Sequence, residues 1–289
     1  MTLGQSQDAR VVLRAEGLVR VFPSAAGDVH AVDGIDIELR AGELLAVRGA
    51  SGAGKTTLLN LLGALDRPTS GRVWIGDVDT TDLPEDDLAA LRRDALGFVF
   101  QSFGLIPVLS ARENVELPLR IARTDPAERD ERVADALAMV GLAAHAQQRP
   151  AELSGGQQQR VGIARAIVAR PRVLIADEPT GQLDSRTAAT IMDLLGELAH
   201  RQGLAAIVST HDPLLVARAD RVIEVHDGRI VRDGDGGGGG DGDGRGGGGD
   251  SGRRGTDAAA QPAPLATAST APVPRTRAEA RRDREGSGA

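Results

Sequence analysis

The sequence contains neither cysteine nor tyrosine, and aromatic residues make up only 2% of its 289 positions. Without cysteine the chain can form no disulfide and no thiolate zinc site, which suits a reducing compartment. Because aromatic residues are so few, the core must be built from Leu, Val, Ile and Ala. The length allows one large domain or two small ones.

Long apolar runs are also missing. No stretch approaches the roughly 20 apolar residues needed to cross a bilayer, and the longest runs, such as 44–47 and 173–176, have the length of core strands. The first residues, MTLGQSQDAR, include no apolar signal region. We therefore expect the chain to stay in the cytosol, and any role at a membrane to depend on a partner.

Basic residues are almost all arginine: among 34 Lys and Arg, only Lys55 is a lysine. The formal net charge is −7, and no dense block of basic residues occurs in the first 230 positions. These features argue against a nucleic-acid-binding surface. A single lysine within a glycine-rich loop indicates a chemical need for a compact ammonium group rather than a planar guanidinium.

Strand-like and helix-like segments alternate along most of the chain. Strands are expected at 11–16, 35–39, 44–47, 72–76, 173–176 and 205–209. The dipeptide Asp227-Gly228 lies between two apolar-rich runs and predicts a hairpin over 222–231. From about 84 to 151 the periodicity becomes helical, with a capping box at Ser110–Glu113 and an N-cap at Asp125. The pattern predicts an α/β core with an inserted helical subdomain.

The ends of the chain differ in composition from the middle. From Gly234 onward, glycine runs with Asp and Arg give way to an Ala/Pro/Thr stretch and then to an arginine-rich end. Such a segment buries too little apolar surface to offset its ordering entropy and is predicted to be disordered. A weak interaction arm is the alternative. The predicted organisation is a tail at 1–9, a domain at 10–233 and a tail at 234–289.

A phosphate-binding loop follows the strand at 44–47. The motif G-x-x-x-x-G-K-[ST] is matched in full, with Thr57 directly after it, by Gly49, Ala50, Ser51, Gly52, Ala53, Gly54, Lys55 and Thr56. The glycines let backbone N–H groups point at phosphate oxygens, and the following helix directs its positive dipole end there. Lys55 adds a full charge, and the Thr56 hydroxyl is placed to coordinate Mg²⁺. An ordinary glycine turn is the competing interpretation.

Two carboxylates stand at the end of another buried strand. Asp177 and Glu178 follow the strand at 173–176, where open α/β sheets place their ligands. Asp177 is predicted to hold Mg²⁺ through water, and Glu178 to orient or deprotonate the attacking water. Taken alone, two acids after a strand are usually a helix cap or a solvated turn. Together with the phosphate loop, they predict a P-loop NTPase that binds a nucleotide with Mg²⁺, and these two motifs indicate no more than that.

A third motif, LSGGQQQR at 153–160, opens another helix. A hydroxyl and two glycines at a helix N-terminus make a second anion-binding site, formed by Ser154, Gly155, Gly156 and Gln157. A plain helix cap would explain Ser154 but neither the second glycine nor Gln157. This string resembles the signature of the ABC ATPase family, and the resemblance covers residues 10–233.

The resemblance implies a P-loop NTPase fold of the ABC type, an α/β core with an antiparallel β subdomain and an inserted helical subdomain. It also implies a homodimer in which two nucleotide domains stack head to tail, so that Ser154 and Gly156 would contact ATP held by the opposite chain. Gln101 would sense Mg²⁺ and the γ-phosphate, and His211 would reach the γ-phosphate. Asp184 would lie in the interface loop. Isolated from the family pattern, Gln101 could be a surface residue and His211 a cap for the helix after it.

Phe22 resembles the aromatic residue on which adenine stacks, with core packing as its rival. Small departures from the family pattern occur at Ala50 and Ala53, where the backbone matters more than the side chain. A further departure is Gln182, which stands where Asn is common. Because its side chain is longer, the interface geometry at this position is the least secure of the features carried over from the family.

The segments at 63–76 and 97–119 resemble the macrolide-efflux, lipoprotein-release and cell-division subgroup. In that subgroup the second segment receives a coupling helix, which would make 103–109 a docking patch. The chain is therefore expected to be an ATP-hydrolysing subunit at the cytoplasmic face of the membrane, paired with an integral-membrane permease that exports a substrate or releases lipoproteins. An ATP-switched regulator of a cell-wall or division complex is the alternative, because both would use the same residues. A chromosome-organising ATPase would need a long coiled coil after Gln101, and ribosome-acting relatives carry the motifs twice.

Overall fold

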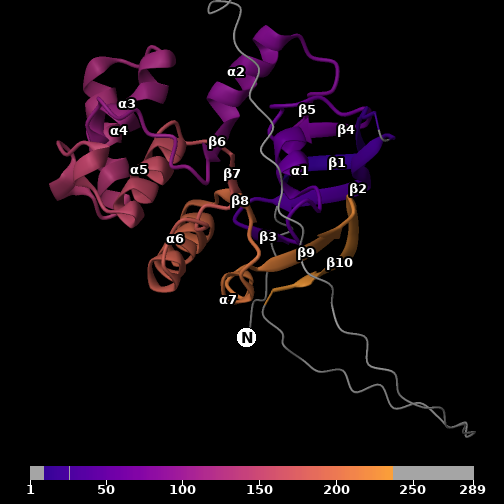
Figure 1. Cartoon of the computed structure of the whole chain (residues 1–289). Helices are drawn as coiled ribbons and strands as arrows, with labels where there is room; N and C mark the ends of the chain where they lie inside the picture. The colour runs from indigo at the N-terminus through magenta and orange to yellow at the C-terminus, as the bar shows by residue number, and fades with distance from the viewer. Residues whose placement is uncertain (1–9, 26, 237–289) are drawn as a thin grey trace, which may run out of the picture. The chain divides into compact units, whose positions relative to one another are not determined.

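A computed structural model describes residues 10–25 and 27–236 (Figure 1). The predicted tail at 1–9 and the part of the predicted C-terminal tail from 237 to 289 lie outside the described residues. Two residues of that expected tail are strand: β10 (Arg229–Asp235) pairs Gly234 with Val222 and Asp235 with Arg221. The glycine-rich composition hid this pairing, because the hydrogen bonds of a ladder come from the backbone.

A six-stranded sheet forms the centre of the domain. Its strand order is β10-β9-β3-β8-β7-β6, with β3 parallel to β8 and β9, β7 parallel to β8 and β6, and β9–β10 closing one edge as a hairpin. The remaining strands have the bounds β3 Leu44–Arg48, β6 Leu96–Val99, β7 Val173–Asp177, β8 Ala205–Ser209 and β9 Arg221–His226. The predicted buried strands and the Asp227-Gly228 hairpin are therefore present.

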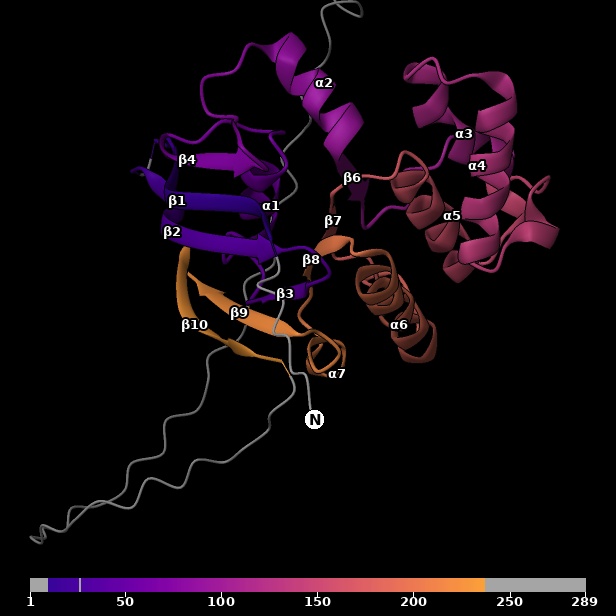
Figure 2. The ribbon, with the colours of Figure 1, turned by 180° about the vertical axis from the view of Figure 1, so that it is seen from behind.

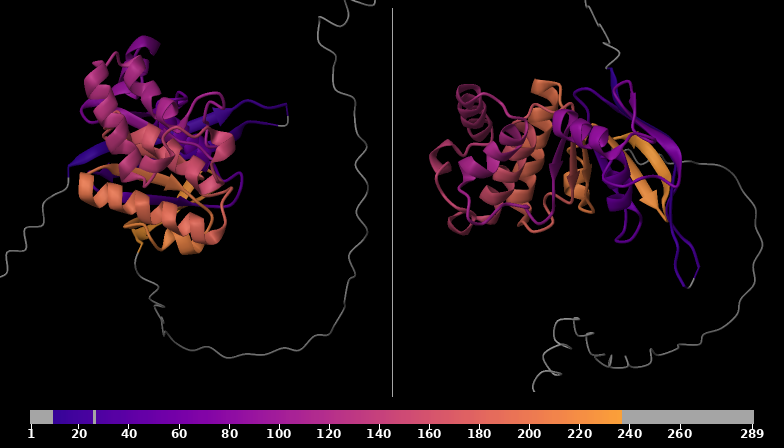
Figure 3. Two further views of the ribbon diagram at one scale, coloured as in Figure 1. Left: turned by 90° about the vertical axis from the view of Figure 1, so that its left-hand side faces the viewer. Right: turned by 90° about the horizontal axis from the view of Figure 1, so that it is seen from above.

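A separate four-stranded sheet has the order β2-β1-β4-β5 and is antiparallel throughout. Its strands are β1 Val11–Phe22, β2 Val29–Arg40, β4 Ser70–Ile75 and β5 Val78–Asp79. The first two run well beyond the expected 11–16 and 35–39, because register shifts let the pairing continue past Gly17. The views from behind and from above show this sheet beside α1 and the hairpin (Figures 2 and 3).

Helices α3 to α7 each begin after a polar side chain that caps them, whereas α1 and α2 have no such cap. Their bounds are α1 Lys55–Leu62, α2 Glu85–Ala95, α3 Ala111–Ile121, α4 Pro126–Met139, α5 Gly155–Ile167, α6 Ser185–Gln202 and α7 Pro213–Val216, with short 3₁₀ turns at Ala143–His145 and Pro150–Glu152. The predicted capping box at Ser110 and Glu113 and the predicted N-cap Asp125 both form. Within the described residues, no helix is long and apolar enough to cross a membrane.

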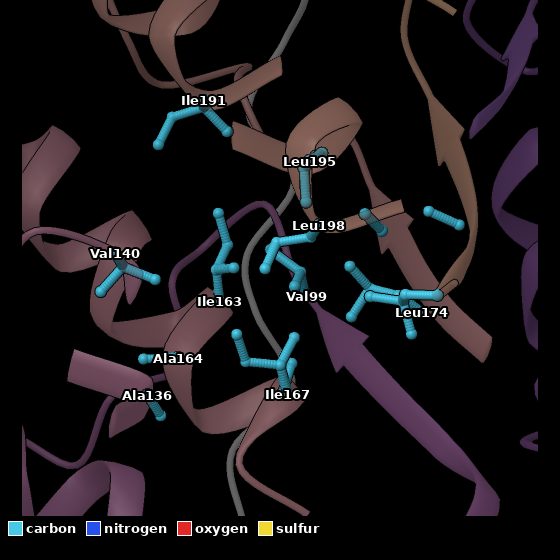
Figure 4. Packing of buried hydrophobic residues seen from close by; sticks show 14 of the residues in the cluster. Val99, Ala136, Val140, Ile163, Ala164, Ile167, Leu174, Ile191, Leu195 and Leu198 are labelled. Atoms are coloured by element: carbon cyan, nitrogen blue, oxygen red, sulfur yellow. The ribbon is translucent and has the colours of Figure 1, made fainter. Parts of the chain in front are cut away.

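The central sheet is buried on both faces. Along β3, Leu44 and Ala46 join a cluster with α5 and α6, whereas Leu45 and Val47 join a cluster with α1 and the antiparallel sheet. This alternation follows from the two-residue period of a strand. Figure 4 shows the first cluster at close range, with side chains drawn from the sheet and from α4, α5 and α6. The two packed faces fix the carboxyl ends of the parallel strands, where the site lies.

The segment expected to be helical from about 84 to 151 contains a strand. After α2 the chain enters β6, whose four residues pair in parallel with β7 inside the central sheet. A run as short as LGFV shows no periodicity of its own, so it was not separable from its helical flanks. Helix α3 packs against α4 and α5, and α5 in turn contacts β6 at the edge of the central sheet (Figure 1).

Candidate active site

The phosphate loop joins β3 to α1 and needs glycine at two places. A Cβ on Gly49 would collide with the carbonyl of Val225. Gly54 has a φ of 102°, and a Cβ there would collide with the carbonyl of Ala31. Only glycine meets both demands, since it has no Cβ and tolerates positive φ. The loop is therefore packed tightly against β9 and β2 on the side away from its open face.

Lys55 lies inside this loop with only 6% of its surface exposed. Its ammonium group donates hydrogen bonds to the carbonyls of Gly49, at 2.9 Å, and Ala50, at 3.0 Å. The same Nζ lies 3.7 Å from Oε1 of Glu178. A buried ammonium group is costly unless it is paired, so the loop carbonyls and Glu178 together make this position tolerable for a charge.

Helix α1 begins without a side-chain cap, whereas α3, α4, α5 and α6 each have one. The backbone N–H groups of its first turn have no partner within the helix by construction. The helix dipole adds positive potential at the same end. Thr56 is exposed and Thr57 is partly exposed at this end of the helix. The N-terminus of α1 therefore presents unpaired donors, the arrangement that suits phosphate.

Ser209, which no sequence motif singles out, holds Asp177 and Glu178 in place. Ser209, fully buried at the end of β8, donates a hydrogen bond from Oγ to Oδ1 of Asp177 at 2.7 Å. The same Oγ accepts a hydrogen bond from the backbone N–H of Glu178 at 2.8 Å. Glu178 has a φ of 43°, unusual for a residue other than glycine. Ser209 thus holds both acidic residues through one hydroxyl.

Three other predicted site residues, Lys55, His211 and Gln101, lie near Glu178. Its Oε1 lies 3.7 Å from Nζ of Lys55 and also 3.7 Å from Nδ1 of His211. Gln101 is close to the same region, because a Cβ added to Gly181 would lie 3.0 Å from Nε2 of Gln101 and 3.5 Å from Oε2 of Glu178. The carboxyl ends of β6, β7 and β8 and the start of α1 therefore bring these side chains into one place.

The signature residues form a second group. Ser154 caps α5 in a capping box with Gln157, accepting from its backbone N–H at 3.3 Å, while the Gln157 side chain accepts from the Ser154 N–H at 2.8 Å. A Cβ on Gly156 would collide with Cγ2 of Thr187, so the start of α5 packs closely on the start of α6. A Cβ on Gly155 would lie 3.4 Å from the Leu183 side chain.

Asp184 belongs to this second group through α6, which it caps. Its carboxylate accepts hydrogen bonds from the Thr187 hydroxyl at 2.7 Å and from the backbone N–H groups of Thr187 and Arg186. The Thr187 hydroxyl, and then its N–H, hold the pKa of Asp184 below its usual value. Among the described residues, Lys55 makes no hydrogen bond or ion pair with Ser154 or Asp184.

Phe22 lies at the end of β1 with 39% of its surface exposed. The guanidinium carbon of Arg20 lies 4.5 Å from the centre of its ring. Core packing, the rival interpretation, does not fit this exposure. The open part of the ring is available to a planar ligand.

Comparison with known protein families places residues 32–181 in the ABC transporter family. The chain belongs to that family. The predicted family and the predicted P-loop fold are thereby confirmed, together with the resemblance to macrolide-efflux members. The family match begins in β2 and ends at Gly181, so it includes the phosphate loop, Gln101, the signature string and the acidic pair.

Named relatives of this ABC family member are export proteins. It is 52% identical over 206 residues to the macrolide export ATP-binding/permease protein MacB of Nitrosomonas europaea, covering 71% of this chain and 31% of that protein. It is also 52% identical over 210 residues to the pyoverdine export ATP-binding/permease protein PvdT of Pseudomonas fluorescens, covering 72% and 32%. The chain thus spans about a third of the length of these curated relatives.

One solved structure matches this chain over nearly the full length of the solved protein. The ATP-binding cassette MJ0796, described as a dimer in a post-hydrolysis state bound to ADP and Pi, is 40% identical with a TM-score of 0.71. The match covers 77% of this chain and 98% of that one. A second structure, cbiO1 of Clostridium perfringens, part of an ABC transporter complex, is 31% identical with a TM-score of 0.71.

The donors around the phosphate loop suit magnesium bound with a nucleotide. Among the described residues, no cluster of three or more His, Cys, Asp or Glu is arranged to hold a metal by itself. Thr56, Gln101 and Asp177 offer a hydroxyl, an amide oxygen and a carboxylate. Mg²⁺ commonly keeps several waters and takes only a few protein ligands besides phosphate oxygens. A set of three oxygen donors therefore fits Mg²⁺ bound together with a nucleotide.

Proposed function

We propose that this chain binds ATP with Mg²⁺ and hydrolyses it as the motor subunit of an exporter. The observation that carries the proposal is the convergence on Oε1 of Glu178, which lies 3.7 Å from both the loop ammonium of Lys55 and the ring of His211. At the open end of a phosphate loop, an ammonium group can bind phosphate oxygens, a carboxylate can position and deprotonate water, and an imidazole can donate a hydrogen bond.

Each group has a distinct role in this proposal. The backbone donors of 49–57 and Lys55 bind the phosphates, and Phe22 stacks on the base. Glu178 orients the attacking water and accepts its proton, while Gln101 and His211 contact the γ-phosphate. Thr56, Gln101 and Asp177 are the residues that would hold Mg²⁺, which would supply positive charge to offset the phosphate oxygens.

We further propose that two chains share each site. Ser154 is exposed at the start of α5, and among the described residues it makes no hydrogen bond to Lys55. A helix start with a hydroxyl and two glycines can bind an anion. In this proposal the anion is the phosphate of ATP held by the phosphate loop of a second chain, so each site is complete only in the dimer. Asp184, exposed at the start of α6, lies at the proposed interface. The MJ0796 cassette is described as a dimer, which supports this arrangement.

The membrane partner is proposed to bind beside the helical segment. Exposed apolar side chains gather there: Phe100 at 43%, Ile106 at 40%, Val108 at 72% and Ile121 at 69%. Of the predicted docking patch at 103–109, Leu105 instead packs on the core. A groove lined by Leu96, Phe98, Phe100, Pro118, Ile121 and Arg165 adjoins these residues.

Such a surface suits an apolar segment of a permease at the cytoplasmic face of the membrane. The relatives' names join an ATP-binding part to a permease part and describe export. These names favour transport over a purely regulatory role.

The requirement for magnesium gives the first test. The full chain, together with membrane proteins that co-purify with it, is expected to release phosphate from ATP in the presence of Mg²⁺. Chelation with EDTA should abolish release, and added Mg²⁺ should restore it. A colorimetric phosphate assay reports the outcome. Hydrolysis that continues in EDTA would overturn the metal assignment, and no hydrolysis under any of these conditions would overturn the proposed activity.

Ser209→Ala is expected to lower the turnover number about tenfold with little change in the KM for ATP, because losing a buried hydrogen bond leaves Asp177 and the Glu178 backbone unanchored. Steady-state phosphate release measures both constants. Thr80→Val is the matched control: the Thr80 hydroxyl is also buried and donates to the Val73 carbonyl at 3.0 Å, but in the antiparallel sheet. Equal losses in the two variants would show that Ser209 acts only through stability.

A further inference from the structure

We propose that the turn between β9 and β10 holds the phosphate loop in its binding shape, with Asp33 and Arg229 as positioning residues for nucleotide binding. The inference rests on the proposed function, because it assigns a support to the loop that binds the phosphates. It concerns three segments far apart in sequence: the loop at 49–54, the turn at 227–229 and β2 at 31–33.

The turn is bonded directly to the phosphate loop. The backbone N–H of Gly228 donates to the carbonyl of Ala53 at 3.0 Å. A Cβ on Gly54 would lie 3.5 Å from Cα of Gly228, so the two glycines pass close to one another. Asp227 and Gly228 have φ values of 46° and 75°, the left-handed pair of a tight hairpin turn. The turn therefore places a backbone donor on the loop immediately before Gly54 and Lys55.

The other side of the turn is bonded to β2. The carbonyl of Gly228 accepts a hydrogen bond from the backbone N–H of Asp33 at 2.8 Å. The guanidinium of Arg229 contacts Oδ2 of Asp33 through Nε at 2.9 Å and Nη2 at 2.6 Å. A Cβ on Gly228 would lie 2.9 Å from the carbonyl of His30. Gly228 is thus held between β2 and the loop, and the Asp33–Arg229 pair closes this contact from outside.

The beginning of the loop is tied to the same hairpin. Arg48, the last residue of β3, pairs across the sheet with Glu224 of β9, and their side chains lie 2.7 Å apart. Gly49 follows at once and lies against the carbonyl of Val225. The loop therefore leaves β3 beside β9 and reaches α1 beside the β9–β10 turn. Both of its ends depend on one hairpin for their position.

This arrangement predicts which kinetic constant responds to its loss. Several backbone N–H groups must point at the phosphates together, so a loosened loop weakens binding. Glu178 directly follows β7 and Ser209 ends β8, and in the described part of the chain the turn makes no hydrogen bond to either strand. The support therefore acts on nucleotide affinity and leaves bond cleavage in the filled site unchanged.

The experiment uses the full chain and two single variants, Asp33→Ala and Arg229→Ala. An exposed charge pair contributes up to about fivefold in an equilibrium constant, so each variant is expected to raise the KM for ATP and the Kd for ADP about three- to fivefold. The turnover number at saturating ATP should stay within about twofold of wild type, since the filled site is unchanged. The double variant should be no weaker than either single variant.

The matched control is Asp233→Ala. Asp233 pairs with Arg221 at 2.7 Å on the same hairpin, at the end away from the phosphate loop. This variant removes an equivalent carboxylate and is expected to leave nucleotide affinity unchanged. Thermal unfolding of all variants checks the fold. Gly228→Ala, which adds a Cβ 2.9 Å from the His30 carbonyl at a positive φ, should raise the ADP Kd more than either charge variant does.

The outcomes separate this inference from the proposed function. If the wild-type chain binds ATP and the Asp33→Ala and Arg229→Ala variants bind it equally tightly, the positioning role alone would be overturned. Equal weakening by Asp233→Ala, or a fall in turnover number without a change in affinity, would also overturn it. A wild-type chain that binds no ATP or ADP would overturn both proposals.

Discussion

Glu178→Gln is expected to stop ATP hydrolysis while leaving ATP bound, so that the chain accumulates as a dimer with trapped nucleotide. Glutamine keeps the size of the side chain and can still hydrogen-bond the attacking water, but it cannot accept a proton at neutral pH. Loss of a positioned general base lowers turnover by about 10²- to 10⁴-fold. Its charge also disappears beside the γ-phosphate, which removes a repulsion within the closed dimer.

Light scattering with Mg²⁺-ATP measures the mass of this variant, and a phosphate assay measures its turnover. The dimer should form with ATP and not with ADP. Glu197→Gln, an exposed glutamate on α6 outside the site, is the control and should behave as wild type. Hydrolysis by Glu178→Gln at the wild-type rate would show that another group is the base.

Lys55→Ala is expected to weaken ATP binding at least tenfold and to abolish measurable turnover at ordinary ATP concentrations. A hydrogen bond to a charged group contributes about 1.5–3 kcal/mol, which corresponds to about 10- to 150-fold in affinity. The chain has no other lysine that could substitute. Glu178 would also lose the ammonium group that lies 3.7 Å from it.

Calorimetric titration with ATP measures this loss directly. Lys55→Arg is the informative companion, because the planar guanidinium cannot reproduce a compact ammonium that donates to the carbonyls of both Gly49 and Ala50. It is therefore expected to weaken binding as well. Wild-type affinity in Lys55→Ala would mean that the loop binds phosphate through its backbone alone.

The parts of the fold that were predictable are those written in local patterns. The glycine loop, the caps at Ser110, Asp125 and Ser154, and the hairpin at Asp227 each depend on neighbours within a few residues. Such signals survive in a single sequence because their hydrogen bonds are local.

What the sequence could not supply depends on contacts between distant segments. Ser209 looked like the last residue of a buried strand, and only the pairing of β7 with β8 brings its hydroxyl to Asp177. The strand β6 was hidden between helical segments, since its four residues carry no period. The contact of the Gly228 turn with the phosphate loop is likewise set by sheet order, which no local pattern encodes.

The candidate site was predicted as a set of residues but not as an arrangement. The chemistry of Lys55, Asp177, Glu178 and His211 follows from residue type and order along the chain. The convergence of Lys55 and His211 on one carboxylate oxygen of Glu178 follows from the parallel strands. In the described part of the chain, no hydrogen bond or ion pair links Ser154 to Lys55, and the proposed sharing of sites would bring the two residues together across a dimer.

That sharing is the central claim, and mixing two inactive variants tests it most directly. Lys55→Ala damages the phosphate loop, and Ser154→Arg blocks the signature helix. In a head-to-tail dimer of one chain of each kind, one site carries both defects and the other carries none. Random mixing in equal amounts should therefore restore up to about a quarter of wild-type phosphate release, since half of the dimers hold one intact site of two. If the mixture is no more active than its separate components, with both variants folded and able to dimerise, the two groups do not form one site across the dimer.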